Sequence, residues 1–202
     1  MKRRLRTGND TSGLQLKKTV ELGAHLAFLD ESGFLLIPTR SRTWGPKGKT
    51  PIVRYSYRHD RISALAALTV SAKQKHMGLY TRFQRENFKA VHVAEFLRAL
   101  LSHIRGPIIL LWDGGNIHKG PKIRKVLIKN PRLRIEWFPG YAPELDPVEQ
   151  VWNDFKRHTA NSMPLTRHDI RISLHANSRR AQSSQAKLRS YILSSELPSP
   201  TW

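Results

Sequence analysis

The feature that most constrains the fold of this chain is the stretch from Pro107 to His118, which reads Pro-Ile-Ile-Leu-Leu-Trp-Asp-Gly-Gly-Asn-Ile-His. Its five consecutive apolar residues do not alternate with polar ones, a pattern that is typical of a strand buried on both faces of a sheet. Because a carboxylate is costly to bury, we expect Asp113 at the point where this strand leaves the sheet. The glycines that follow let the backbone turn sharply and let a ligand approach closely.

The stretch from Ala24 to Gly33 repeats this pattern, with an apolar run, then Asp30, then a nearby glycine. It predicts a second buried strand that ends at Asp30. If the two strands lie parallel and adjacent, Asp30 and Asp113 emerge at the same carboxyl edge, where open α/β sheets bind their ligands. Each aspartate taken alone has a simpler explanation, as a turn or capping residue at the end of a strand.

The rest of the hydrophobic pattern predicts an α/β fold with a mixed sheet. The expected elements are a strand over 62–70, its hairpin partner over 78–84, a helix capped by Asn87, a basic helix over 121–129 and a half-exposed strand over 133–137. Asp146, Pro147 and Glu149 fit the N-cap, N1 and N3 positions of a helix. Thr166 and Asp169 resemble the capping box of a further helix. We therefore predict a β-hairpin on one side of the sheet, parallel strands at its centre and helices on its faces.

The charge of the chain indicates a polyanionic partner. Its 202 residues include 35 Lys and Arg against 15 Asp and Glu, a net charge of +20, which favours nucleic acid over a small acidic substrate. A ribosomal-type basic protein is the alternative. The absence of cysteine from the sequence excludes disulfides, thiolate metal sites and cysteine nucleophiles. With no secretory signal and no apolar segment long enough for a membrane, we expect a cytoplasmic, nucleoid-associated protein that acts on double-stranded DNA.

Candidate DNA contacts combine basic residues with aromatic ones. They are Arg40, Arg42, Trp44, Lys47 and Lys49 in a loop, His118 and Lys119 after the Asp113 strand, and Arg167, Arg171 and Arg179 on the last predicted helix. Basic residues interleaved with an aromatic ring suit a nucleic-acid backbone and its bases, and cations spaced by four line one helix face. The alternatives are a solvated loop anchored by its tryptophan, a solvated helix face, and a structural histidine at position 118.

Three acids are candidates for chemistry: Asp30, Asp113 and Glu149. Clustered carboxylates repel one another, and the cations that suit oxygen ligands are Mg²⁺ and Mn²⁺. Two such ions about 4 Å apart can hold the attacking and leaving oxygens of a phosphoryl transfer. Glu149 is explained equally well by helix capping, and sequence spacing does not separate the two roles.

Four stretches, taken as a set, resemble the DDE transposases of bacterial insertion sequences in the mariner-like superfamily. They are Leu29–Phe34, Arg42–Pro46, Leu111–His118 and Phe138–Trp152, and the resemblance covers roughly residues 24–195. It implies a ribonuclease H-like fold, a mixed five-stranded sheet flanked by helices. By matching position, Asp30, Asp113 and Glu149 become catalytic residues and ligands of two Mg²⁺ or Mn²⁺ ions. The resemblance also implies cleavage at transposon ends and 3′-hydroxyl transfer into TA-containing target DNA, by a homodimer in a synaptic complex.

The chain also departs from this family pattern. Family members usually carry helix-turn-helix modules before the catalytic domain, whereas about 23 residues precede the first predicted strand here. We expect a basic arm or remnant linker over 1–23, the catalytic domain over 24–195 and a tail over 196–202. Asp146 stands where the family often has asparagine; it could be an extra acid that alters metal affinity, but we interpret it as the N-cap. A hydrolytic nuclease of the same fold and a non-catalytic DNA-binding fragment are the alternative functions.

Overall fold

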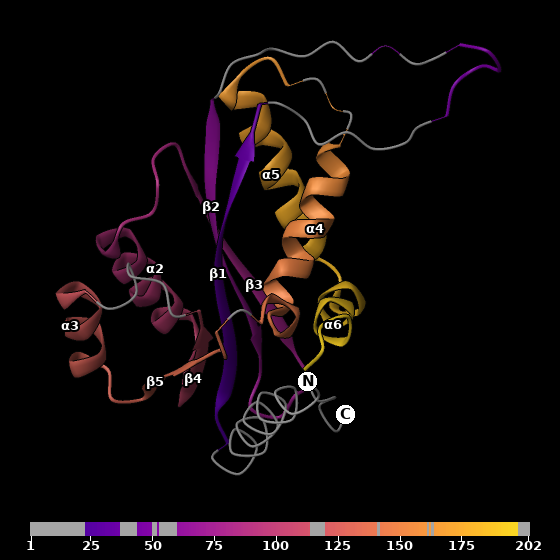
Figure 1. Cartoon of the computed structure of the whole chain (residues 1–202). Helices are drawn as coiled ribbons and strands as arrows, with labels where there is room; N and C mark the ends of the chain where they lie inside the picture. Colours follow the sequence, from indigo (N-terminus) through magenta and orange to yellow (C-terminus); the bar gives the residue numbers. More distant parts are fainter. Residues whose placement is uncertain are drawn as a thin grey trace, which may run out of the picture.

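The fold is organised around one mixed sheet in the order β3-β2-β1-β4-β5 (Figure 1). The structure is a computed structural model and describes residues 23–36, 44–49, 52, 60–113, 120–140, 142–160, 162 and 164–197. Its strands are β1 (His25–Leu35), β2 (Arg61–Val70), β3 (Met77–Gln84), β4 (Ile108–Trp112) and β5 (Leu133–Trp137). β1, β2 and β3 pair antiparallel, while β1, β4 and β5 pair parallel. The predicted mixed sheet, with a hairpin on one side and parallel strands at its centre, is confirmed.

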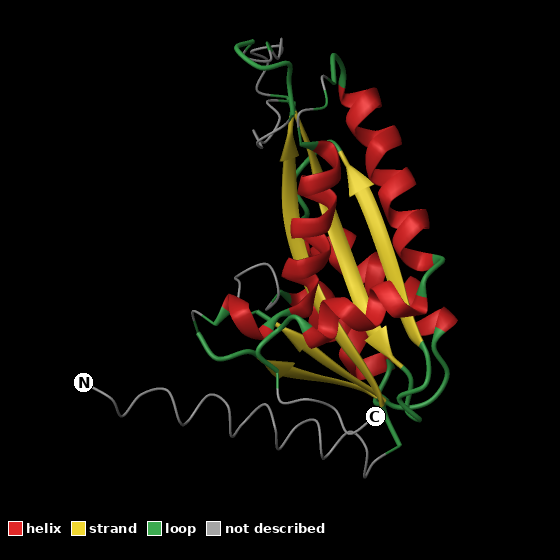
Figure 2. Cartoon of the chain, turned by 90° about the vertical axis from the view of Figure 1, so that its right-hand side faces the viewer, coloured by secondary structure: helices red, strands yellow, loops and turns green. Residues whose placement is uncertain are grey.

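Helices cover both faces of the sheet. They are α2 (Ala90–His103), α3 (Pro121–Lys129), α4 (Pro147–Thr159), α5 (Arg167–Gln182), α6 (Gln185–Leu193) and the short 3-10 helix η2 (Pro143–Leu145). α2 and α3 lie on one side, and α4, α5 and α6 lie on the other, the side that faces the viewer in Figure 2. In the part of the chain that the structure describes, no helix is long and apolar enough to cross a membrane.

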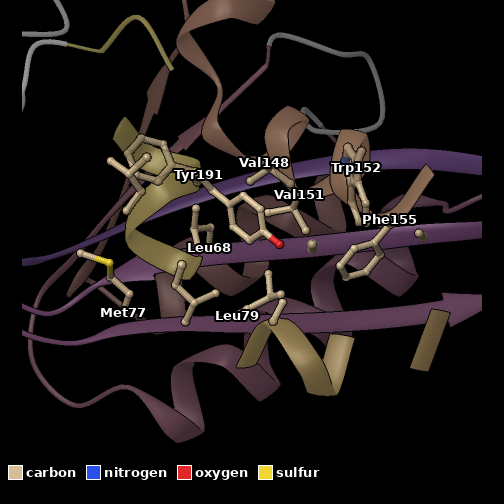
Figure 3. Close-up of a cluster of buried hydrophobic side chains, with 14 of the residues drawn as sticks. Leu68, Met77, Leu79, Val148, Val151, Trp152, Phe155 and Tyr191 are labelled. Atoms are coloured by element: carbon tan, nitrogen blue, oxygen red, sulfur yellow. The ribbon is translucent and has the colours of Figure 1, made fainter. Parts of the chain in front are cut away.

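Alternation along the strands divides the core into two layers. In β1, Leu26 and Phe28 pack with the α4–α6 layer, whereas Ala27 and Leu29 pack with α2 and α3. The α4–α6 layer is filled by residues from strands and helices, among them Leu68, Met77, Leu79, Val148, Val151, Trp152, Phe155 and Tyr191 (Figure 3). By the same alternation, the side chain of Asp30 belongs to the face that α4 covers.

The end of β1 differs from the sequence-based prediction. β1 does not stop at Asp30 but continues to Leu35, because residues 31–35 keep pairing with residues 61–65 of β2. The strand that does stop is its other neighbour, β4, whose pairing with β1 ends at Trp112 opposite Leu29. Asp30 therefore lies within a long strand, just beyond the point where β4 leaves the sheet.

The start of α2 is also later than predicted. Its N-cap is Lys89, not Asn87, and the backbone N–H of Lys89 lies 3.2 Å from Nδ1 of His92. The Asn87 carbonyl accepts a hydrogen bond from the side chain of Gln84 instead. Because the chain near Asn87 turns to satisfy the end of β3, the helix begins only after this turn.

Helix α6 was not predicted from the sequence. Its residue Gln185 accepts a hydrogen bond from the backbone N–H of Met77 and donates one to the Met77 carbonyl, both at 2.9 Å. Gln182 of α5 similarly donates to the Leu79 carbonyl at 2.8 Å. These side chains satisfy backbone groups of the edge strand β3, which would otherwise be open to pairing with another strand.

Candidate active site

The register of the two central strands brings Asp30 and Asp113 together. Leu29 and Trp112 are the last parallel pair of β1 and β4, and each is followed directly by an aspartate. In parallel strands, residues at the same level point to the same face of the sheet. Asp113 is exposed at the end of β4, as predicted, while Asp30 is half-buried within β1.

Helix α4 brings two further acids to the same place. Asp146 is its N-cap, and Oδ1 of this residue accepts a hydrogen bond from the Val148 N–H at 2.8 Å. Pro147 occupies the first helical position, and Glu149 lies in the first turn, as the sequence predicts. Since Val148 is fully buried against the sheet, the N-terminus of α4 is fixed over β1. The structure therefore places Glu149 near Asp30 and adds Asp146 beside it.

The acids act on one another electrostatically. Burial, then the negative charges of Glu149 and Glu31, raise the pKa of Asp30 to about 7. Burial, then the charge of Asp30, raise the pKa of Asp146 well above its usual range, and Glu149 and Asp113 add to this shift. We refer to Asp30, Asp113, Asp146 and Glu149 as the acidic cluster.

Trp152 has a role at this cluster that sequence reasoning missed. The indole is fully buried in the core between α4 and the sheet. In addition, its Nε1–H donates a hydrogen bond to Oδ2 of Asp30 at 2.9 Å. A signal was present in the sequence, because a buried indole N–H needs an acceptor and Trp152 follows Glu149 by three residues, on the same helix face.

The chemistry of the acidic cluster fits a hard divalent cation. Its side chains offer only oxygen ligands, the donors that Mg²⁺ and Mn²⁺ prefer. The charged groups that act on Asp30 are the acids Glu149 and Glu31, so a bound cation would relieve their repulsion. Over the described ranges, however, no three acidic or histidine side chains already converge as ligands of one ion.

The structure describes only some of the candidate DNA contacts. Arg40, Arg42, His118 and Lys119 lie outside the described residues. Trp44 is 99% exposed, and Lys47, Lys49, Arg171 and Arg179 are exposed as well. Arg167 is half-buried, and its Nη2 lies 3.3 Å from Oδ1 of Asp60. This ion pair within the protein partly neutralises the charge of Arg167.

Comparison with solved structures supports the fold assignment. A pre-cleavage Mos1 transpososome has 13% sequence identity and a TM-score of 0.64, over 98% of this chain and 64% of that one. A Mos1 mariner paired-end complex with Mn has 14% identity and a TM-score of 0.61, with the same coverage. The isolated catalytic domain of Mos1 mariner transposase has 11% identity and a TM-score of 0.56, and the match covers 98% of this chain and 97% of that one.

These matches confirm the ribonuclease H-like fold. The chain spans 64% of the length of the transposase chains in the two complexes. Comparison with curated protein sequences gives no match. A family model described as DDE superfamily endonuclease matches residues 25–171, which is well over half of the sequence. The chain therefore belongs to the DDE superfamily endonucleases.

Proposed function

We propose that this chain is the catalytic domain of a DDE transposase of the mariner-like superfamily, encoded by a bacterial insertion sequence. It cleaves DNA at transposon ends and transfers the resulting 3′-hydroxyl to TA-containing target DNA. The observation that carries the proposal is the register that sets Asp30 beside Asp113, with Glu149 brought to the same face by α4. The catalytic domain spans residues 24–195, between a basic arm and a short tail.

In this proposal Asp30, Asp113 and Glu149 hold two Mg²⁺ or Mn²⁺ ions. When bound, such ions supply electrostatic stabilisation of the attacking and leaving oxygens of a phosphodiester. Asp113 is exposed and Glu149 is half-exposed, so both side chains have room to rotate toward Asp30. Burial and Glu149 raise the pKa of Asp30 to about 7, and a bound cation would favour the deprotonated form of this carboxyl, which is the form that acts as a ligand.

The basic surface supplies the affinity for DNA. The net charge of +20 favours a polyanion, and binding that releases counterions weakens steeply as salt rises. Arg171, Arg179, Lys47 and Lys49 are exposed and available for phosphate contacts, and Trp44 for stacking on a base. The proposed set of DNA contacts is completed by His118, Lys119, Arg40 and Arg42. It also includes Arg167, whose charge is shared with Asp60.

The assembly is proposed by analogy with the matched Mos1 structures, which include paired-end complexes with Mn and with Mg and a strand transfer complex. We propose that two copies of this chain bring two transposon ends together in a synaptic complex. The protein acts on the bacterial nucleoid, in the cytoplasm.

The test separates strand transfer from hydrolysis. A pre-cleaved oligonucleotide with a free 3′-hydroxyl is incubated with a supercoiled plasmid, Mn²⁺ and either the wild type or Glu149→Gln. We expect joined products from the wild type and none from the variant, with equal DNA binding by both. Nicking without joining would identify a hydrolytic nuclease of the same fold, and DNA binding without either activity would identify a non-catalytic fragment.

A further inference from the structure

The indole of Trp152 ties α4 to the acid on β1. Its Nε1–H donates to Oδ2 of Asp30 at 2.9 Å, and the ring is fully buried. An indole nitrogen only donates and a carboxylate only accepts, so the direction of this bond is fixed. A carboxylate has about four lone-pair sites. The indole of Trp152 and the backbone of Glu31 both hydrogen-bond to Asp30, and the remaining sites can serve as metal ligands.

The packing around Trp152 holds the donor in place. Its ring meets Phe34 edge-on at a centroid distance of 6.0 Å, and Phe155 edge-on at 5.9 Å. Figure 3 shows Trp152 and Phe155 together in the buried cluster between α4 and the sheet. A ring enclosed in this way cannot turn its N–H elsewhere, so it restricts the rotation of the Asp30 carboxylate.

The position of Trp152 on α4 links this bond to Glu149. The two residues are three apart and therefore lie on the same face of the helix. Asp30 is held by the pairing of β1 with β2, in which it lies opposite Ala66. A hydrogen bond between Trp152 and Asp30 thus sets how α4 sits on β1, and with it the position of Glu149 relative to Asp30.

We propose that Trp152 is a positioning residue for divalent cations, and that its indole N–H orients the Asp30 carboxylate as a ligand. This inference rests on the proposed function, since it needs a cation at the acidic cluster. Groups that hydrogen-bond to metal ligands commonly change metal affinity by about 10- to 100-fold when they are removed. If Trp152 only filled space, loss of its N–H would leave cation affinity unchanged.

The experiment removes the N–H and keeps the shape. Trp152 is replaced by 3-benzothienylalanine, in which sulfur stands in the place of the indole N–H, and separately by phenylalanine. The matched control is Tyr191→Phe, which removes a hydroxyl that donates to another buried acid of α4, Asp154, at 2.8 Å. Mn²⁺ alone is titrated into the full chain, and free Mn²⁺ is followed by electron paramagnetic resonance. Thermal unfolding reports the folding of each protein.

We expect both Trp152 replacements to weaken Mn²⁺ binding by about tenfold, whereas Tyr191→Phe binds Mn²⁺ like the wild type. The benzothienyl protein should keep its unfolding temperature, and the nicking rate should recover at high Mn²⁺. If the benzothienyl protein binds Mn²⁺ as tightly as the wild type while Asp113→Asn binds it more weakly, the inference about Trp152 is overturned and the proposed cation site stands. Equal binding by the wild type and Asp113→Asn overturns the proposed cation site, and this inference with it.

Discussion

Helix α4 carries two buried aspartates with opposite surroundings, Asp146 at its N-terminus and Asp154 in its third turn. Asp146 lies among other acids, and burial followed by the charge of Asp30 raises its pKa. Asp154 lies among donors contributed by the following helices. The hydroxyl of Tyr191 donates to it at 2.8 Å, and Nζ of Lys187 donates at 3.0 Å.

Two further basic side chains complete the surroundings of Asp154. Nη2 of Arg180 lies 3.4 Å from Oδ2, and Nδ1 of His158 lies 3.4 Å from Oδ1. Burial acts to raise the pKa of Asp154, but the hydrogen bonds from Tyr191 and Lys187 outweigh it, and the pKa lies below its usual value. Burial, then Asp154 itself, raise the pKa of Tyr191.

The difference between these two sites lies in how the negative charge is balanced. The protein neutralises Asp154 with its own side chains, and in doing so fastens α5 and α6 to α4. At the acidic cluster, the charges that act on Asp30 are negative. A chain that is otherwise rich in Lys and Arg therefore keeps a concentrated negative site where β4 ends, which suits a cation from solution.

The largest stability effect should come from Asp154→Asn. Loss of the charge leaves Lys187 and Arg180 without their acidic partner, and breaking a buried ion pair in this way should cost about 3 kcal/mol. Urea unfolding measures this cost. An equally stable variant would contradict a structural role for the Asp154 site.

The opposite sign is expected for Asp30→Asn in the absence of divalent cations. An asparagine oxygen can still accept from Trp152, but the cost of burying a charge and the repulsion with Glu149 are both gone. The variant should therefore be more stable than the wild type by about 2 kcal/mol at pH 8. The same urea experiment measures it. Added Mn²⁺ should stabilise the wild type and leave the variant unchanged. A destabilised Asp30→Asn protein would mean that the acidic cluster is not strained.

The pH dependence of stability should distinguish the two sites. Folding raises the pKa of Asp30 to about 7, so the folded state binds more protons than the unfolded one between about pH 4 and 7, and this carboxyl lowers stability as pH rises through that range. Folding lowers the pKa of Asp154, so its contribution is present above about pH 4 and is lost as pH falls further.

The variants allow this pH dependence to be checked. Without divalent cations, Asp30→Asn should remove a decrease in stability between about pH 4 and 7, and Asp154→Asn should remove a loss of stability below about pH 4. Chemical unfolding over the pH series measures both. The assignment is wrong if the Asp30 variant follows the wild-type curve between pH 4 and 7.

The smallest effect should come from Tyr191→Phe. It removes a single hydrogen bond from a buried acid that keeps Lys187 as a partner, at a cost of about 1 kcal/mol. The measurement is again urea unfolding, compared with Asp154→Asn. A cost as large as that of Asp154→Asn would show that Tyr191, rather than the cations, stabilises this site.

Much of this architecture was readable in the sequence because its signals are local. The apolar run before Asp113 predicted β4 and the level at which its acid emerges. The sequence Asp146-Pro147-Val148-Glu149 predicted the start of α4, since capping depends on neighbouring residues. The resemblance to transposases, and not the spacing of residues, favoured a functional role for Glu149.

What could not be predicted depends on contacts between distant parts of the chain. Asp30 was placed at a strand end, because its sequence alone does not reveal that β2 continues to pair beyond it. Asp146 was judged an N-cap, and only the folded arrangement brings Asp30 close enough to raise its pKa. The bond from Trp152 to Asp30 joins residues 122 positions apart. Helix α6 forms side-chain hydrogen bonds to Met77 and Asp154, which are far away in sequence.

The measurement that tests the central claim most directly is cleavage of supercoiled DNA by the wild type and by Asp113→Asn, with Mn²⁺, with Mg²⁺ and with excess chelator. If the acidic cluster is a cation-dependent catalytic site, the wild type nicks DNA only with a divalent ion. The variant should lose at least about 1,000-fold in rate, which corresponds to roughly 4 kcal/mol of transition-state stabilisation, while it binds DNA equally well. Nicking that persists in chelator, or at the wild-type rate in Asp113→Asn, would contradict it.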